Sequence, residues 1–180
     1  MTKTISIKKE IEENDILLMF VPGNFYHERV GDIILASQKM FSRICCVSLN
    51  RPCETVASML KKSEADIEKI IFIDCTTSNF SRPKTGINVF YVSSPKALTE
   101  LSIAINKAIT KEKAKVLVFD SLCTLLLYEQ PSTVIKFSHS VISRLRENKV
   151  KGVFICLRDD IKSELFKDIS MFVDKIVEVD

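Results

Sequence analysis

The sequence contains no tryptophan and only four glycines and five prolines among its 180 residues. Collagen-like and low-complexity chains are rich in glycine and proline, so this composition excludes both classes. No apolar run reaches the roughly 18 residues that a membrane-spanning helix needs, and the opening MTKTISIKKEIEEN has no apolar core of a signal peptide. We therefore expect neither membrane insertion nor export, and a cytoplasmic location.

The cysteines lack the spacing of a metal site, because none of the six occurs in a CxxC pair. Zinc sites need thiolates at close spacing, and disulfide frameworks are typical of small secreted chains. We expect no metal centre and no disulfide framework. Five of the six lie in or beside apolar runs and are expected to be buried reduced thiols. Cys53 is the exception, at an expected exposed junction between a loop and a helix.

A strong charge of either sign is also missing. The 26 Lys and Arg exceed the 23 Asp and Glu by only +3, and basic and acidic residues are interleaved. A nucleic-acid footprint normally needs a concentrated basic patch, so this balance argues against nucleic acid as a partner. The content of 46% apolar and 27% charged residues is typical of a globular protein, and we expect residues 1–180 to form one domain.

The sequence does contain short apolar runs that alternate with segments of helical period. This alternation predicts an α/β domain, with a mostly parallel sheet of six or seven strands and helices on both faces. The expected strands are 16–21, 44–49, 70–73, 89–92, 116–119, 153–157 and 176–179. Several are apolar at consecutive positions, which is typical of strands that are covered on both faces.

Between these runs, five segments repeat apolar residues at a spacing of three and four, which predicts helices with one core-facing stripe. They are 30–41, 54–62, 97–109, 134–145 and 161–172. The segment 76–88 has turn residues and no clear period, so we expect an irregular loop suited to contact a partner. Residues 1–14 are interpreted as an N-terminal extension.

The stretch FVPGNFYHE, residues 20–28, follows an apolar run and precedes a helix, as a phosphate-binding loop does. Such a loop needs GxxxxGK[ST]: glycine lets the amides surround the phosphates, lysine neutralises them, and the hydroxyl holds magnesium. Of these, only Gly23 remains. It is followed by Asn24, Phe25, Tyr26 and His27. The rings of Phe25 and Tyr26 are expected to fill the phosphate cavity, and the alternative is a plain turn between strand and helix.

VLVFDSL, residues 116–122, has four apolar residues followed by Asp120 and Ser121. This is the Walker B pattern, in which the aspartate positions a hydrated magnesium ion. The alternative is an aspartate that merely closes a buried strand. Asp74 and Asp174 also border apolar runs and are expected to cap a helix or a turn.

The remaining polar residues give no catalytic signal. His27 and His139 have no carboxylate or cysteine motif around them, so neither is expected to act in catalysis or to bind a metal. No serine lies in a G-x-S-x-G setting, which argues against an acyl-transfer nucleophile.

In their order and spacing these segments resemble a RecA/KaiC-like P-loop ATPase domain, in particular the degenerate archaeal relatives of KaiC. The matching stretches are LLMFVPGN, ICCVSLNRP, IIFIDCTT, VLVFDSL, FSHSVISRLRENKVKGVFICL and MFVDKIVEVD, and the similarity covers residues 15–180. The resemblance implies a RecA-like fold. RecA-like subunits normally pair through their nucleotide-site faces.

In the active family, the loop lysine and threonine bind ATP and magnesium, and a glutamate after the second strand activates the attacking water. Here Tyr26 and His27 take the first two places, and Asn50 takes the third. A neutral amide cannot accept a proton from water. Of the hydrolytic set only Asp120 is left, and losing the others together removes nearly every contact that stabilises phosphoryl transfer.

The resemblance and these losses together imply a catalytically inactive domain without a cofactor, which serves as a protein-interaction or regulatory module. Its partner would be a second copy or an active paralogue. The degenerate nucleotide site would comprise Gly23, Asn24, Tyr26, His27, Asp120 and Ser121. Two alternatives stay open: a nucleotide-binding ATPase with an atypical phosphate loop, and a DNA-binding accessory protein related to recombinase paralogues.

Overall fold

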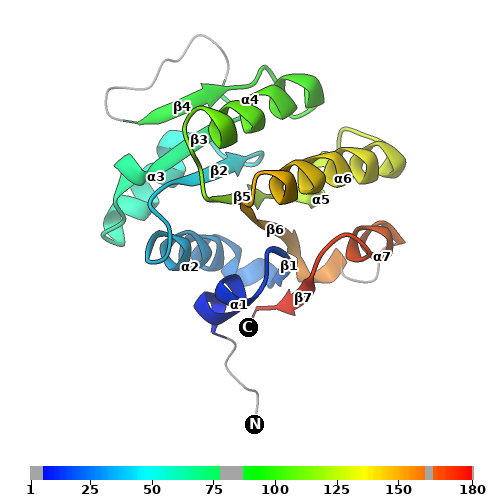
Figure 1. Cartoon of the computed structure of the whole chain (residues 1–180), viewed down its shortest axis with the longest axis horizontal. Coiled ribbons are helices and arrows are strands. Elements are labelled where there is room, and N and C mark those ends of the chain that lie inside the picture. Colours follow the sequence, from blue (N-terminus) through cyan, green and yellow to red (C-terminus); the bar gives the residue numbers. More distant parts are fainter. Residues whose placement is uncertain (1–5, 78–86, 161–163, 180) are drawn as a thin grey trace.

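The seven apolar runs form one parallel sheet, in the order β4-β3-β2-β5-β6-β1-β7 (Figure 1). The structure is a computed structural model that describes residues 6–77, 87–160 and 164–179. The strands are β1 Ile16–Val21, β2 Ile44–Ser48, β3 Ile70–Asp74, β4 Asn88–Tyr91, β5 Val116–Asp120, β6 Lys151–Leu157 and β7 Lys175–Glu178. Every pairing between them is parallel. The predicted α/β fold is confirmed, with seven strands.

The helices form two layers, one on each face of the sheet. They are α1 Ile7–Glu13, α2 Tyr26–Gln38, α3 Cys53–Lys62, α4 Leu98–Thr110, α5 Leu122–Leu125, α6 Pro131–Glu147 and α7 Glu164–Ser170. From β1 to β4 the chain moves in one direction across the sheet, and from β4 to β7 it moves back. Because parallel crossovers are right-handed, this reversal sends α2 and α3 to one face and α4 to α7 to the other. Figure 1 shows these two groups on either side of the strands.

Each face of the sheet has its own apolar core. In β1, Ile16, Leu18 and Phe20 face the core under α4 to α7. Leu17, Met19 and Val21 face the core under α1, α2 and α3. Since side chains alternate along a strand, covering both faces requires apolar residues at consecutive positions. This explains the unbroken apolar run of β1.

The N-terminal segment is more than an extension, because it includes helix α1. The Ser6 side chain caps this helix by accepting a hydrogen bond from the backbone N–H of Lys9 at 3.5 Å. Ile11 is fully buried in the core beneath α1, α2 and α3. The sequence-based interpretation missed this helix because it is short and presents only one buried residue.

Other elements differ in detail from the predictions. Helix α2 begins at Tyr26, earlier than expected, because the loop before it is a single 3-10 turn, η1 (Gly23–Phe25). The short helix α5 was not expected. Helix α7 falls within the predicted 161–172, of which 161–163 lie outside the described residues. In the predicted loop 76–88, residues 78–86 likewise lie outside them.

Cys123 is partly exposed, and the other five cysteines are buried. The buried set includes Cys53, so the expectation that this thiol is exposed is wrong. Cys53 is the first residue of α3, and its backbone N–H points back into the protein to Asp74. In the described part of the chain, no helix has both the length and the apolar character needed to cross a bilayer.

Candidate functional site

The carboxyl ends of β1, β2, β5 and β6 lie side by side at one edge of the sheet. After β2 the chain enters α3 on one face, whereas after the adjacent β5 it enters α5 and α6 on the other. Ligands of open α/β sheets bind at such reversals, in the crevice outside the carboxyl ends of the strands. The side chains at this edge are therefore the candidates for a functional site.

Of the residues expected in the phosphate-binding loop, Tyr26 is the one whose side chain contacts the end of β5. It begins α2 directly after η1, and its ring is buried in the core beneath α1, α2 and α3. The hydroxyl donates a hydrogen bond of 2.5 Å to Oδ1 of Asp120. Burial raises the pKa of Tyr26, and the charge of Asp120 raises it further. The phenol is therefore protonated and serves as a donor.

Asp120 ends β5 and is buried. Besides Tyr26, its Oδ1 accepts a hydrogen bond of 3.3 Å from Nδ2 of Asn50, which follows β2. Burial raises the pKa of Asp120, and the hydrogen bond from Tyr26, the charge of Arg51 and the hydrogen bond from Asn50 offset this only in part. Among the described residues, the two side chains that donate hydrogen bonds to this carboxylate are thus both neutral.

A chain of hydrogen bonds extends from Asp120 to the start of α5. Thr124 donates from Oγ1 to Oδ1 of Asn50, and Oγ1 of Thr124 lies 3.0 Å from Oγ of Ser121. The structure therefore brings Tyr26, Asp120 and Ser121 together with Asn50 in one polar cluster. Thr124 was not predicted, although one polar residue in the otherwise apolar LCTLLL was a usable signal.

A cavity of about 510 Å³ opens beside this cluster. It is lined by Tyr26, His27, Asn50, Ser121, Cys123, Thr124, Leu126, Leu127 and Leu157. None of these described lining residues is a lysine or an arginine. Three of them are leucines, and Leu127 is 78% exposed at its mouth. The described lining of the space beside Asp120 is therefore largely apolar, and His27 is its one side chain that can carry a positive charge.

The other residues of the expected phosphate-binding loop, Gly23, Asn24 and Phe25, do not line the cavity. Phe25 is 48% exposed, so the prediction that its ring fills the cavity is wrong. The adjacent Tyr26 is buried because it starts α2, whereas Phe25 still belongs to the 3-10 turn. Asn24 is exposed on the same turn. A Cβ at Gly23 would lie 3.9 Å from Leu157 Cδ2, an ordinary contact, so nothing in the space around it requires glycine.

The two other aspartates singled out in the sequence, Asp74 and Asp174, stabilise the fold by accepting hydrogen bonds from backbone N–H groups. Asp74 ends β3 and accepts hydrogen bonds from the backbone N–H groups of Cys53, Thr76 and Thr77. It thereby caps α3 and the turn after β3, as predicted. Asp174 accepts from the backbone N–H of Ile16 at 2.7 Å and pairs with Arg146. Neither aspartate lines the cavity at the carboxyl edge.

The histidines do not form a site together. His27 lines the cavity, whereas His139 packs against the ring of Phe172, with centroids 4.7 Å apart. Within residues 6–77, 87–160 and 164–179, no group of three or more His, Cys, Asp and Glu side chains is arranged to hold a metal ion.

The parallel sheet and its two helical layers define an α/β fold, and a solved structure has the same fold. The KaiC-like protein PH0186 from the hyperthermophilic archaeon Pyrococcus horikoshii superimposes with a TM-score of 0.67. The match has 15% sequence identity and covers 91% of this chain and 70% of that protein. The fold is therefore RecA/KaiC-like.

The sequence also matches a described family. Residues 27–179 match the "Family of unknown function (DUF7504)", and the chain belongs to this family. No curated protein sequence matches the chain.

Proposed function

We propose that this chain is a catalytically inactive RecA/KaiC-like domain that acts as a protein-interaction or regulatory module. The observation that carries the proposal is the hydrogen bond between Tyr26 and Asp120. In active relatives, the resemblance places a lysine near Tyr26 and a magnesium-positioning carboxylate at Asp120. Here the phenol already occupies one lone pair of that carboxylate, and its ring takes up the space beside it.

The electrostatics of the cavity support the same proposal. Phosphoryl transfer depends on cations that stabilise the charge on the transferred group. Arg51 is close enough to influence Asp120, but it is not among the residues that line the cavity. Its Nε and Nη2 atoms are buried and have no hydrogen-bond partner among the described residues, so this guanidinium lies within the protein rather than in the cavity. Because no lysine or arginine is among the described residues that line the cavity, the cavity is poorly suited to a triphosphate.

The rim of the cavity supports an interaction with protein. Leu127 and Leu157 line the cavity and are exposed, and Phe25 is exposed on the η1 turn beside Leu157. Exposed apolar side chains grouped around a hollow are typical of protein interfaces. We propose that this rim, defined by Phe25, Leu127 and Leu157, contacts a second copy of the chain or an active paralogue.

Light scattering after size-exclusion chromatography tests the interface. We expect the purified chain to form a dimer, or to co-purify with an intact RecA-like paralogue, and Leu127→Asp to abolish the association. Met171→Asp is the matched control, because Met171 is 77% exposed but lies after α7, away from the rim. A monomer at high concentration without a RecA-like partner would contradict the proposed interface, as would equal effects of the two variants.

A phosphate-release assay with ATP and magnesium tests the loss of catalysis separately. We expect the wild-type chain and Asp120→Ala to release phosphate at the same background rate. Turnover that disappears in Asp120→Ala would instead identify an ATPase with an atypical phosphate loop.

A further inference from the structure

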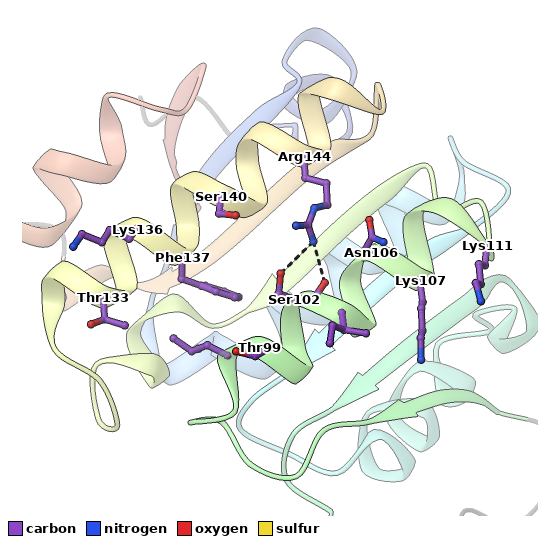
Figure 2. Close-up of a pocket in the computed structure, with 12 residues that line it drawn as sticks. Thr99, Ser102, Asn106, Lys107, Lys111, Thr133, Lys136, Phe137, Ser140 and Arg144 are labelled. Carbon is purple, nitrogen blue, oxygen red and sulfur yellow. Dashed lines mark hydrogen bonds between the residues drawn. The ribbon is translucent and has the colours of Figure 1, made fainter.

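A second recessed surface lies away from the rim, between helices α4 and α6 (Figure 2). This groove has a volume of about 710 Å³. Leu98, Ile103 and Phe137 give it an apolar floor, and Ile103 is 52% exposed. Residues from two separate parts of the chain form the walls, brought together because β5 and its flanking connections place α4 beside α6.

The groove is positively charged. Four of its lining residues are cations, namely Lys107, Lys111, Lys136 and Arg144, and among the described lining residues there is no Asp or Glu. In the part of the chain that the structure describes, none of the four forms an ion pair. Figure 2 shows Arg144 reaching from α6 across to α4, where it donates hydrogen bonds of 3.1 Å to the carbonyl oxygen and Oγ of Ser102.

Favourable interactions with the helix dipole explain the positions of only some of these cations. Lys107 and Lys111 lie at the C-terminal end of α4, where cations interact favourably with the helix dipole. Their spacing of four residues nevertheless makes them repel one another. Lys136 lies near the N-terminal end of α6, where a cation gains nothing from the dipole. The groove thus has cations on both walls, with no Asp or Glu among its described lining residues, and a negatively charged partner would complement them.

We infer that this groove docks an acidic amphipathic helix of a partner protein. Its apolar face would cover Ile103 and Phe137, and its carboxylates would lie against the lysines of both walls. Binding a helix between two helices is an established mode of peptide recognition. The apolar floor favours protein over nucleic acid, because binding of nucleic acid depends on a continuous basic track with stacking aromatic residues. This surface differs from the rim, so the two proposals stand independently.

An NMR titration of the full ¹⁵N-labelled chain tests the inference at low salt. The probe is a synthetic amphipathic helix with a leucine stripe flanked by glutamates, and its control carries lysine in place of each glutamate. We expect the acidic peptide to shift the amide signals of α4 and α6, and the lysine peptide to leave them unchanged. Lys107→Gln/Lys136→Gln should weaken the affinity about three- to tenfold, since exposed ionic contacts are individually modest. Ile103→Ser should weaken it as well.

The matched control is Lys61→Gln/Lys62→Gln, which removes the same charge from α3 on the opposite face of the sheet. It should leave the affinity unchanged, and so should Leu127→Asp at the rim. The inference is overturned if the acidic peptide shifts no signal of α4 or α6, or if the two lysine pairs have equal effects. Binding of single-stranded oligothymidylate in the same groove, without binding of the peptide, would also overturn it.

Discussion

Two buried aspartates flank the same residue of the sheet and are held in opposite ways. Asp74 at the end of β3 and Asp120 at the end of β5 both lie in register with Ser48 of β2. Asp74 accepts three hydrogen bonds from backbone N–H groups and two from the hydroxyls of Thr76 and Thr77. Asp120 accepts one from a phenol and one from an amide.

The pKa values of the two carboxyl groups differ accordingly. Burial alone would raise the pKa of Asp74, but its hydrogen bonds from Cys53, Thr77 and Thr76 outweigh burial and lower it. At Asp120, burial prevails and the pKa is raised. The comparison shows that the surroundings of Asp74 stabilise its charged form, whereas the surroundings of Asp120 favour its neutral form. A carboxyl group whose pKa is raised by burial is a candidate for a functional position rather than a structural one.

The largest expected effect is at the architectural aspartate. Asp74→Ala leaves three backbone donors without their acceptor at the start of α3 and in the following turn. Because unsatisfied buried donors are costly, we expect a loss of about 3 to 5 kcal/mol in the free energy of unfolding. Urea denaturation measures it. An effect no larger than that of Asp120→Asn would contradict the distinction between the two aspartates.

The second prediction concerns the pair at the candidate site. Tyr26→Phe removes the donor from a buried carboxylate and should destabilise the fold by about 1 to 3 kcal/mol. In an Asp120→Asn background the same change should cost less, because the uncharged amide needs the donor less. Tyr128→Phe is the matched control and should have no effect, since Tyr128 is exposed. Equal costs of Tyr26→Phe in both backgrounds would mean that the hydrogen bond contributes little.

The third prediction is that pH acts on the two aspartates with opposite sign. The lowered pKa of Asp74 gives stability that is present above its ordinary value of 3.8 and is lost as pH falls through the folded-state pKa. Asp74→Asn should therefore be most destabilising at neutral pH. The raised pKa of Asp120 gives stability that is present below 3.8 and is lost as pH rises through the folded-state pKa.

Asp120→Asn should therefore be most destabilising in acid. Unfolding free energies of the wild type and both variants, measured at neutral pH and below pH 3.8, check these signs. Parallel pH profiles for the two variants would refute them.

The smallest expected effect is at Phe25, the neighbour of Tyr26. Phe25→Ser replaces a ring that is 48% exposed and should change the free energy of unfolding by less than about 0.5 kcal/mol. Thermal and urea unfolding measure this. A loss as large as that of Tyr26→Phe would show that both rings pack into the protein.

The strands and the main helices could be predicted because their signals are local. The consecutive apolar residues of β1 required a strand covered on both faces, and the acid that follows four apolar residues in β5 placed Asp120 at the edge of the sheet. The different fates of Phe25 and Tyr26 could not be predicted, because they depend on where a 3-10 turn becomes a helix. The burial of Cys53 depended on its backbone bond to Asp74, a contact between distant residues.

The groove between α4 and α6 also escaped prediction. Lys107 and Lys136 belong to different helices, and the sequence alone does not show that these helices pack side by side. Only the packing of the two helices on one face of the sheet gathers their charges. A nearly neutral chain can therefore have a local basic surface, which net charge does not reveal.

The most direct test of the central claim is calorimetric titration of the intact chain with ATP and magnesium. If Tyr26 has replaced the phosphate-binding machinery beside Asp120, the wild type and Asp120→Ala will both give no binding heat at millimolar nucleotide. Micromolar binding by the wild type that is lost in Asp120→Ala would contradict the claim and show that this chain binds a nucleotide beside Asp120.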